Sequence, residues 1–227
     1  MIKHATEKYV RIIIFIVFSW LIVLFTVPAR ASSVINVGLT VSQFSAELVA
    51  PSSFVATEPD GKRATLNKGK YFIAADKGKF KLGDRQLASG TVLEIVEQED
   101  KNGASAGRPH QHFTVNRQEY RGTLIICLTN EGKSLTVVNR VPIEYYVNSV
   151  LGPKSSPIWP DEAIKAQAVA ARSLAWYYKH HPESNLFDVR AVEPETFYGG
   201  IRNENKNITK VAAQTVGQVS TLTAALQ

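Results

Sequence analysis

The fold is decided by residues 159–181, whose sequence is WPDEAIKAQAVAARSLAWYYKHH. Pro160 suits the first position of a helix, because the N–H that proline lacks would have no partner there. Asp161 and Glu162 complement the positive end of the helix dipole, and the basic residues 179–181 complement its negative end. These signals predict one long helix over most of the stretch.

One face of the predicted helix is apolar, because small and hydrophobic residues recur along it at spacings of four and three. They are Ile164, Ala168, Ala171, Ala175 and Tyr178. Alanine is abundant, and its small side chain lets a neighbouring element approach the helix backbone closely. We therefore expect this alanine-rich helix to be central, in the middle of its domain rather than on its surface.

The chain that precedes this helix has the pattern of short strands between turns. Apolar or alternating runs lie at residues 34–39, 54–56, 71–74 and 92–96. Residues 120–128 and 134–139 predict a hairpin closed over a turn at 130–133. A polar loop is predicted at 97–111.

Helical periodicity begins after Asn139. Residues 141–151 predict a helix opened by a proline, and a loop at 152–158 leads from it to the long helix. Beyond the long helix, residues 186–192 predict a short strand and residues 203–218 a final helix with Val211 and Ala212 facing inward.

The first 31 residues have the parts of a secretory signal peptide. Three basic residues precede an apolar run at 12–27, and Ala29-Arg30-Ala31 has the small-x-small form of a signal peptidase site. We expect cleavage after Ala31 and export to the periplasm, the cell wall or the extracellular space. The alternative is an uncleaved leader that anchors the protein in a membrane.

The patterns combine into an α+β fold. The predicted parts are a signal peptide at 1–31 and one domain at 32–219. That domain has a β-rich part at 32–139 and a helical core at 140–219, which is built around the long central helix.

The charge balance excludes some partners. The whole chain has a net charge of +6, but residues 32–227 carry 22 Lys and Arg against 19 Asp and Glu, a net charge of +3. Such a small excess does not predict nucleic-acid binding, although it is compatible with an anionic wall polymer. The single Cys127 has no partner for an internal disulfide, and its apolar neighbours predict a buried, unreactive thiol.

Three polar residues of the long helix are candidates for binding. Lys165 and Arg172 are seven residues apart and lie on nearly the same face. They would form a cationic surface for an anionic ligand, the alternative being an ordinary solvated helix face. Gln167 stands between alanines, and we expect it to be buried and hydrogen-bonded to a neighbouring loop.

No metal site and no cofactor is predicted. His110 and His112 form an H-x-H, but no Cys, Asp or Glu completes a ligand set at a recognisable spacing. His180 and His181 are adjacent and would point to different sides of a helix. Ser, His and Asp are present without a nucleophile elbow that would gather them.

Several segments, taken in order, resemble a known family. They are YRGTL at 120–124, VVNRVPIEYYV at 137–147, WPDEAIKAQAVAARSLA at 159–175, FYGG at 197–200 and TVGQV at 215–219. In this order they resemble the stage II sporulation protein D / amidase enhancer (SpoIID/LytB) domain family, and the resemblance covers residues 120–219.

The resemblance implies action on bacterial peptidoglycan. Some members look like lytic transglycosylases that cut glycan strands stripped of stem peptides, and others like enhancers of a wall amidase. In the first reaction one carboxyl group protonates the glycosidic oxygen, and it or a partner then takes the proton of the sugar's C6 hydroxyl as an anhydro ring closes. The family also implies that a set of residues lines a glycan cleft. In this sequence the set is Lys165, Gln167, Arg172, Tyr198 and Gly199.

This chain departs from the family at the acid. The family's catalytic Glu stands five residues before the aromatic that opens the long helix, and counting back from Trp159 gives Lys154. An ammonium group is a poor substitute for a carboxylic acid at neutral pH. Glu144 and Glu162 are the nearest carboxylates, and solvation or dipole complementarity explains both.

A second departure is that family members continue beyond the equivalent of Val219, whereas eight residues follow it here, so we expect a truncated domain. Three hypotheses remain open. The first is an exported protein that binds glycan strands or modulates a cell-wall amidase without cutting. The second is an active glycan-cleaving enzyme that uses another carboxylate, and the third is a non-functional fragment.

Overall fold

The described residues begin at Ser33. The structure is a computed structural model that describes residues 33–58, 60–83, 85–89, 92–97, 112–192 and 197–220. The predicted signal peptide, His110 with most of its predicted loop, and residues 221–227 lie outside the described residues. The residues from Ser33 onward belong to one compact unit.

Strands dominate the first part of this unit, and helices follow. The strands are β1 (Val34–Gln43), β2 (Ser45–Ala50), β3 (Phe54–Thr57), β4 (Arg63–Leu66), β5 (Gly69–Asp76), β6 (Lys79–Leu82), β7 (Arg85–Ser89), β8 (Val92–Glu97), β9 (His112–Val115), β10 (Gln118–Arg121), β11 (Thr123–Thr129), β12 (Ser134–Pro142) and β13 (Val189–Arg190). The helices are α2 (Ile143–Lys154), α3 (Asp161–His180) and α4 (Lys206–Ala212), with single 3₁₀ turns η2 (Gly200–Asn203) and η3 (Ala213–Thr215). The α+β class with a β-rich first part is confirmed.

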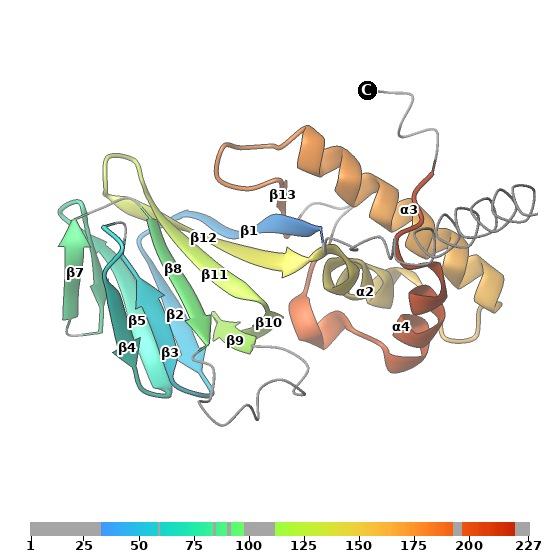
Figure 1. Cartoon of the computed structure of the whole chain (residues 1–227), viewed down its shortest axis with the longest axis horizontal. Coiled ribbons are helices and arrows are strands. Elements are labelled where there is room, and N and C mark those ends of the chain that lie inside the picture. Colours follow the sequence, from blue (N-terminus) through green and yellow to red (C-terminus); the bar gives the residue numbers. More distant parts are fainter. Residues whose placement is uncertain are drawn as a thin grey trace, which may run out of the picture. The chain divides into compact units, whose positions relative to one another are not determined.

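The strands form two sheets (Figure 1). One has the order β13-β1-β12-β11-β8-β3-β4 and the other β10-β9-β2-β5-β6-β7. β13 pairs with β1 in parallel, and the strand pairs that make up the rest of both sheets are antiparallel.

The predicted hairpin is confirmed, because β11 and β12 pair from Thr129 opposite Ser134 to Thr123 opposite Arg140. Tyr120 was predicted in the same strand as β11 but belongs to β10 of the other sheet. The reason is Gly122, whose φ of 89° breaks the strand in a region that favours glycine.

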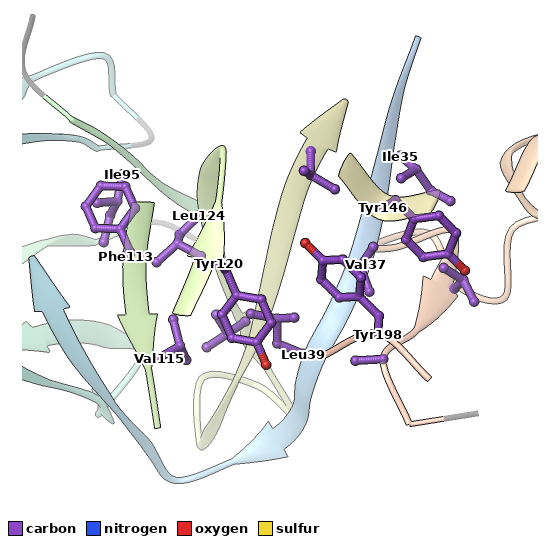
Figure 2. Packing of buried hydrophobic residues seen from close by; sticks show 14 of the residues in the cluster. Ile35, Val37, Leu39, Ile95, Phe113, Val115, Tyr120, Leu124, Tyr146 and Tyr198 are labelled. Carbon is purple, nitrogen blue, oxygen red and sulfur yellow. The ribbon is translucent and has the colours of Figure 1, made fainter. Parts of the chain in front are cut away.

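One hydrophobic core joins the sheets to the helices. Strand alternation turns every second side chain inward, as in β6, where Phe80 and Leu82 are buried between exposed lysines. Figure 2 shows part of this core, from Ile95, Phe113 and Leu124 on the strands to Tyr146 on α2. The core continues onto α3 and α4, and Val211 and Ala212 of α4 are buried, as predicted.

α3 covers one side of the unit. Ile164, Ala168 and Ala175 are buried on its inner face. Ala166 and Ala170 lie on its outer face and are exposed. The expectation that this helix lies in the middle of the domain is therefore wrong for the described residues. The alanines of the outer face are exposed, so no other described element packs against that face. No helix among the described residues is both long and apolar enough to cross a membrane.

Two predicted boundaries move. α2 continues to Lys154, so the connection to α3 begins at Ser155 instead of Gly152. The predicted helix at 203–218 is replaced by the shorter α4 and the turn η3, and Asn203 belongs to the preceding turn η2. Asn205 caps α4, since its Oδ1 accepts hydrogen bonds from the N–H groups of Asn207 (3.0 Å) and Ile208 (3.3 Å).

The start of β1 is tied to the helices. The N–H of Ile143 donates to the carbonyl oxygen of Ser33 at 2.9 Å, and Lys179 Nζ donates to that of Val34 at 2.7 Å. Behind β1, Phe187 covers a small apolar cluster that includes Cys127. The thiol is buried as predicted, and burial raises its pKa.

Candidate functional site

α2 is held in place by contacts along its length, beginning with an ion pair to α3. Arg172 Nε and Nη2 donate to the two carboxylate oxygens of Glu144 at 2.9 and 2.8 Å. The side chain of Arg172 is 1% exposed and that of Glu144 35%. Arg172 therefore does not share a solvent-facing cationic surface with Lys165, and Glu144 is not simply a solvated carboxylate.

Arg172 also holds the end of the described chain. Its Nη1 donates to the carbonyl oxygen of Gln218 at 2.9 Å, and the N–H of Ser220 donates to Ser173 Oγ at 2.7 Å. Ser173 Oγ in turn donates to the carbonyl oxygen of Val169 at 2.8 Å. The segment 218–220 thus runs across α3 at two polar side chains (Figure 1).

Three tyrosines join α2 to the sheets. The ring of Tyr198 stacks between Tyr120, at a centroid distance of 5.7 Å, and Tyr146, at 5.5 Å. Figure 2 shows all three rings in the core. Tyr198 Oη donates to Asn139 Oδ1 at 2.7 Å. Tyr198 is only 4% exposed, so it supports α2 from inside and does not line a surface cleft.

Burial also changes the acidity of these phenols. It raises the pKa of Tyr120 to about 12 and that of Tyr198 well above its ordinary value. Both side chains are neutral at physiological pH. Their part in the site is packing and hydrogen bonding.

Asn203, the last residue of η2, packs closely against two glycines, Gly152 of α2 and Gly199 of the FYGG segment. A Cβ on Gly152 would overlap the carbonyl oxygen of Asn203, and a Cβ on Gly199 would overlap the Asn203 side chain. Gly199 also accepts a hydrogen bond from Gln118 Nε2 through its carbonyl oxygen. Gly199 is therefore a close-packing position between the sheet and η2.

A second arginine–glutamate pair lies nearby. Arg121 Nε and Nη2 donate to the two carboxylate oxygens of Glu204 at 2.8 and 2.9 Å. The Arg121 guanidinium also lies 5.4 Å from the ring centroid of Tyr145 on α2. This pair could not be predicted from the sequence, because its members are 83 residues apart and no local pattern links them.

Lys154 occupies the last turn of α2 and is exposed. The connection that follows is fixed at both ends. The N–H of Ser155 donates to the carbonyl oxygen of Leu151 at 2.8 Å, and the N–H of Trp159 donates to that of Ser156 at 3.0 Å.

The connection between α2 and α3 presents apolar side chains to solvent. Ile158 is 90% exposed and Trp159 39%. Pro157 and Pro160 flank them and restrict the backbone. We call Lys154, Ile158 and Trp159 the α2–α3 surface. In the sequence, the Pro-Ile-Trp-Pro run indicates this surface, because its two large apolar residues belong to no predicted helix face.

The other predicted binding residues lie on α3. Lys165 Nζ binds Glu162 Oε1 at 2.7 Å, and their side chains are 24% and 83% exposed. Gln167 is exposed, so the prediction that it is buried is wrong. In a helix with 3.6 residues per turn, Gln167 lies about 60° around the axis from Ile164, at the edge of the buried stripe and not within it.

Lys154 is exposed at the end of α2, and Ile158 and Trp159 are exposed on the connection that follows it. Both oxygens of Glu144 accept from Arg172, and Glu162 is a surface partner of Lys165. Among the described residues, no group of three or more His, Cys, Asp or Glu side chains is arranged to hold a metal ion.

A comparison with known families finds a match in the second part of the chain. Residues 131–222 match the family of the stage II sporulation protein, SpoIID. The resemblance predicted from the sequence is thereby confirmed for this segment, which contains α2, α3 and α4.

A relative is an uncharacterized protein of Brachyspira hyodysenteriae, which is 39% identical over 104 residues. The match covers 45% of this chain and 28% of that protein, so the chain spans less than a third of the relative's length. No solved structure matches the chain significantly.

Proposed function

We propose that this SpoIID-type protein acts at the bacterial cell wall as a module that binds peptidoglycan glycan strands without cutting them. The observation that carries the proposal is the exposure of Ile158 and Trp159 on the α2–α3 surface, and by the resemblance to the family Lys154 would stand at the position of its acid. Exposed Trp159 and Ile158 offer apolar contact to the C–H faces of sugar rings, and the restrained connection reduces the entropy lost on binding. Lys165 and Gln167 extend the surface onto α3.

The buried residues of the predicted set support this surface indirectly. Arg172, Tyr198 and Gly199 fix α2 against α3, the sheets and η2, and α2 ends at Lys154. Under this proposal the protein is exported and meets glycan strands outside the cytoplasm. Modulation of a cell-wall amidase is an extension of the same binding role.

The test uses the purified full-length chain and glycan strands stripped of peptides. We expect the strands to bind and no anhydro-muramyl ends to appear in the products by mass spectrometry. Trp159→Ala should weaken binding roughly tenfold, because a stacked ring is lost. Tyr177→Ala is the matched control, since Tyr177 is also a 39% exposed aromatic side chain of the same chain but lies near the far end of α3.

Lys154→Glu separates binding from catalysis. Anhydro ends from the variant alone would mean that the natural protein is a binder with an intact cleft. Anhydro ends from the natural protein would overturn the proposal, and Glu144 and Glu162 would then be substituted in turn. Failure of the natural protein to bind any glycan would also reject it.

A further inference from the structure

Positive charge is concentrated in one short segment, which precedes the SpoIID match in the sequence. Residues 62–81 contain seven Lys and Arg and one acidic residue, Asp76. The rest of residues 32–227 contains fifteen Lys and Arg against eighteen Asp and Glu. This segment therefore has a net charge of +6 while the remainder is net negative at −3.

Strand alternation gathers part of this charge on one face of the β5–β6 hairpin. In β6, Phe80 and Leu82 point into the core, so Lys79 and Lys81 point outward. In β5 the buried Ile73 likewise leaves Lys70 and Phe72 on the outer side. We call Lys70, Phe72, Lys79 and Lys81 the lysine face.

The lysine face combines cations with an exposed aromatic ring. Phe72 is 57% exposed, and Lys70 Nζ lies 5.3 Å from its ring centroid. Lys70 also binds Glu47 at 2.8 Å, and Asp76 stands opposite Lys79 in the strand register. Even so, no carboxylate among the described side chains lies within ion-pair distance of Lys79 or Lys81.

Further lysines lie at the ends of the hairpin. Lys77 is in the turn between β5 and β6, and Lys68 precedes β5. Lys79 and Lys81 are two residues apart in a strand, which separates their backbones by about 7 Å on the same face. The β5–β6 hairpin thus presents several cations on and beside one face.

We propose that the lysine face is a docking surface for an acidic polysaccharide. Charge complementarity favours a polyanion, and the exposed Phe72 ring gives a sugar ring an apolar partner beside the ammonium groups. An anionic lipid surface would also attract the lysines, but the single exposed ring of this face offers it little apolar insertion. The site lies outside residues 131–222 and does not depend on the function proposed for the α2–α3 surface.

The test measures binding of the full-length chain, in a non-ionic detergent, to alginate as a carboxylated polysaccharide and to dextran as a neutral one. Alginate should bind at low salt and dextran should not. The double variant Lys79→Gln/Lys81→Gln should weaken alginate binding roughly tenfold, because two exposed charges are lost. Lys206→Gln/Lys210→Gln is the matched control, since it removes two exposed lysines of α4.

Phe72→Ala separates a saccharide site from a general polyanion site. It should weaken alginate binding and leave binding of polyglutamate unchanged. Equal losses from the two lysine pairs would show an effect of net charge only and overturn the proposal. Absence of alginate binding, or binding only to vesicles of anionic lipid, would overturn it as well. Unchanged thermal melting of each variant confirms that the fold is intact.

Discussion

The two regions of the molecule differ in what they bury. In the β-rich region that ends before β12, residues 33–133, no polar or charged residue other than Tyr120 is buried among those whose side chains the structure describes. In the region 134–220 the buried polar and charged residues are Ser134, Thr136, Asn139, Ser149, Ser155, Arg172, Ser173, Asp188 and Thr215. The second region is the one that matches the SpoIID family.

The difference indicates which kind of interaction determines the structure of each region. An apolar interior is nondirectional, and it tolerates exchanges between side chains of similar volume. A buried polar group needs a partner at a fixed position, so its removal leaves that partner unsatisfied. The first region should therefore tolerate conservative substitutions that destabilise the second region.

The largest effect is expected from Arg172→Met. The substitution removes both hydrogen bonds to Glu144 and the one to Gln218, and it leaves a partly buried carboxylate without its cation. We expect the free energy of unfolding to fall by about 3 kcal/mol, the lower end for a broken buried pair, because Glu144 is partly exposed. Urea denaturation followed by circular dichroism measures it.

The reference substitution is Phe80→Leu in β6, where a fully buried ring is replaced in an apolar surrounding. It should cost about 1.5 kcal/mol or less. The double variant Arg172→Met/Glu144→Gln should recover part of the loss, because no isolated charge remains. An equal or smaller cost for Arg172→Met than for Phe80→Leu would contradict the contrast between the regions.

The next effect concerns the tyrosine stack, where the two regions meet. Burial raises the pKa of Tyr120 to about 12, while the unfolded chain keeps a value of about 10. Below pH 10 both states are protonated and the contribution is complete. Above it the unfolded state loses its proton first, so stability falls by about 2–3 kcal/mol between pH 10 and pH 12.

Burial also raises the pKa of Tyr198, so Tyr198 extends the loss of stability to higher pH. Urea denaturation at several pH values measures the slope, and Tyr120→Phe should flatten it. Because burial also raises the pKa of Cys127, the comparison belongs in a Cys127→Ala background. A slope that Tyr120→Phe leaves unchanged would show that the stack does not set the alkaline limit.

Gly152→Ala tests close packing in the second region. In an ordinary helix this change would stabilise by roughly 0.5–1 kcal/mol. Here the added Cβ would overlap the carbonyl oxygen of Asn203, so α2 and η2 must separate. We expect a loss of about 1–3 kcal/mol by urea denaturation. The sign of the change in the free energy of unfolding decides the test. A stabilised variant would mean that η2 moves away from α2 at little cost.

Much of the fold was predictable because it follows from local patterns. The hairpin of β11 and β12, the start of α2 and the inner stripe of α3 come from periodicity and proline placement. The outer face of α3 was not predictable, because alanine suits both a close contact and an exposed helix surface. The extension of α2 to Lys154 depends on the packing of Gly152 against η2, which is distant in sequence.

The resemblance predicted which residues belong to the site but not what each of them contacts. The resemblance brought out Arg172, Tyr198 and Gly199, but the structure places them as supports of α2, since their partners are 28, 59 and 81 residues away. Glu144 was interpreted as solvated because a sequence pattern does not show which arginine faces it. The roles of Lys154, Lys165 and Gln167 in binding stay predictions.

The smallest effect is expected at the surface, where the two regions should behave alike. Lys165→Ala removes an exposed pair with Glu162, and Lys70→Ala removes the pair with Glu47 in the β-rich region. Each change should cost about 0.5 kcal/mol or less, because solvent screens both pairs. Double-mutant cycles with Glu162→Ala and Glu47→Ala, read by urea denaturation, measure the coupling. A coupling above about 1 kcal/mol for the α3 pair alone would mean that polar pairs determine the structure of the second region at its surface as well as in its interior. Equal small values would confine the difference between the regions to their interiors.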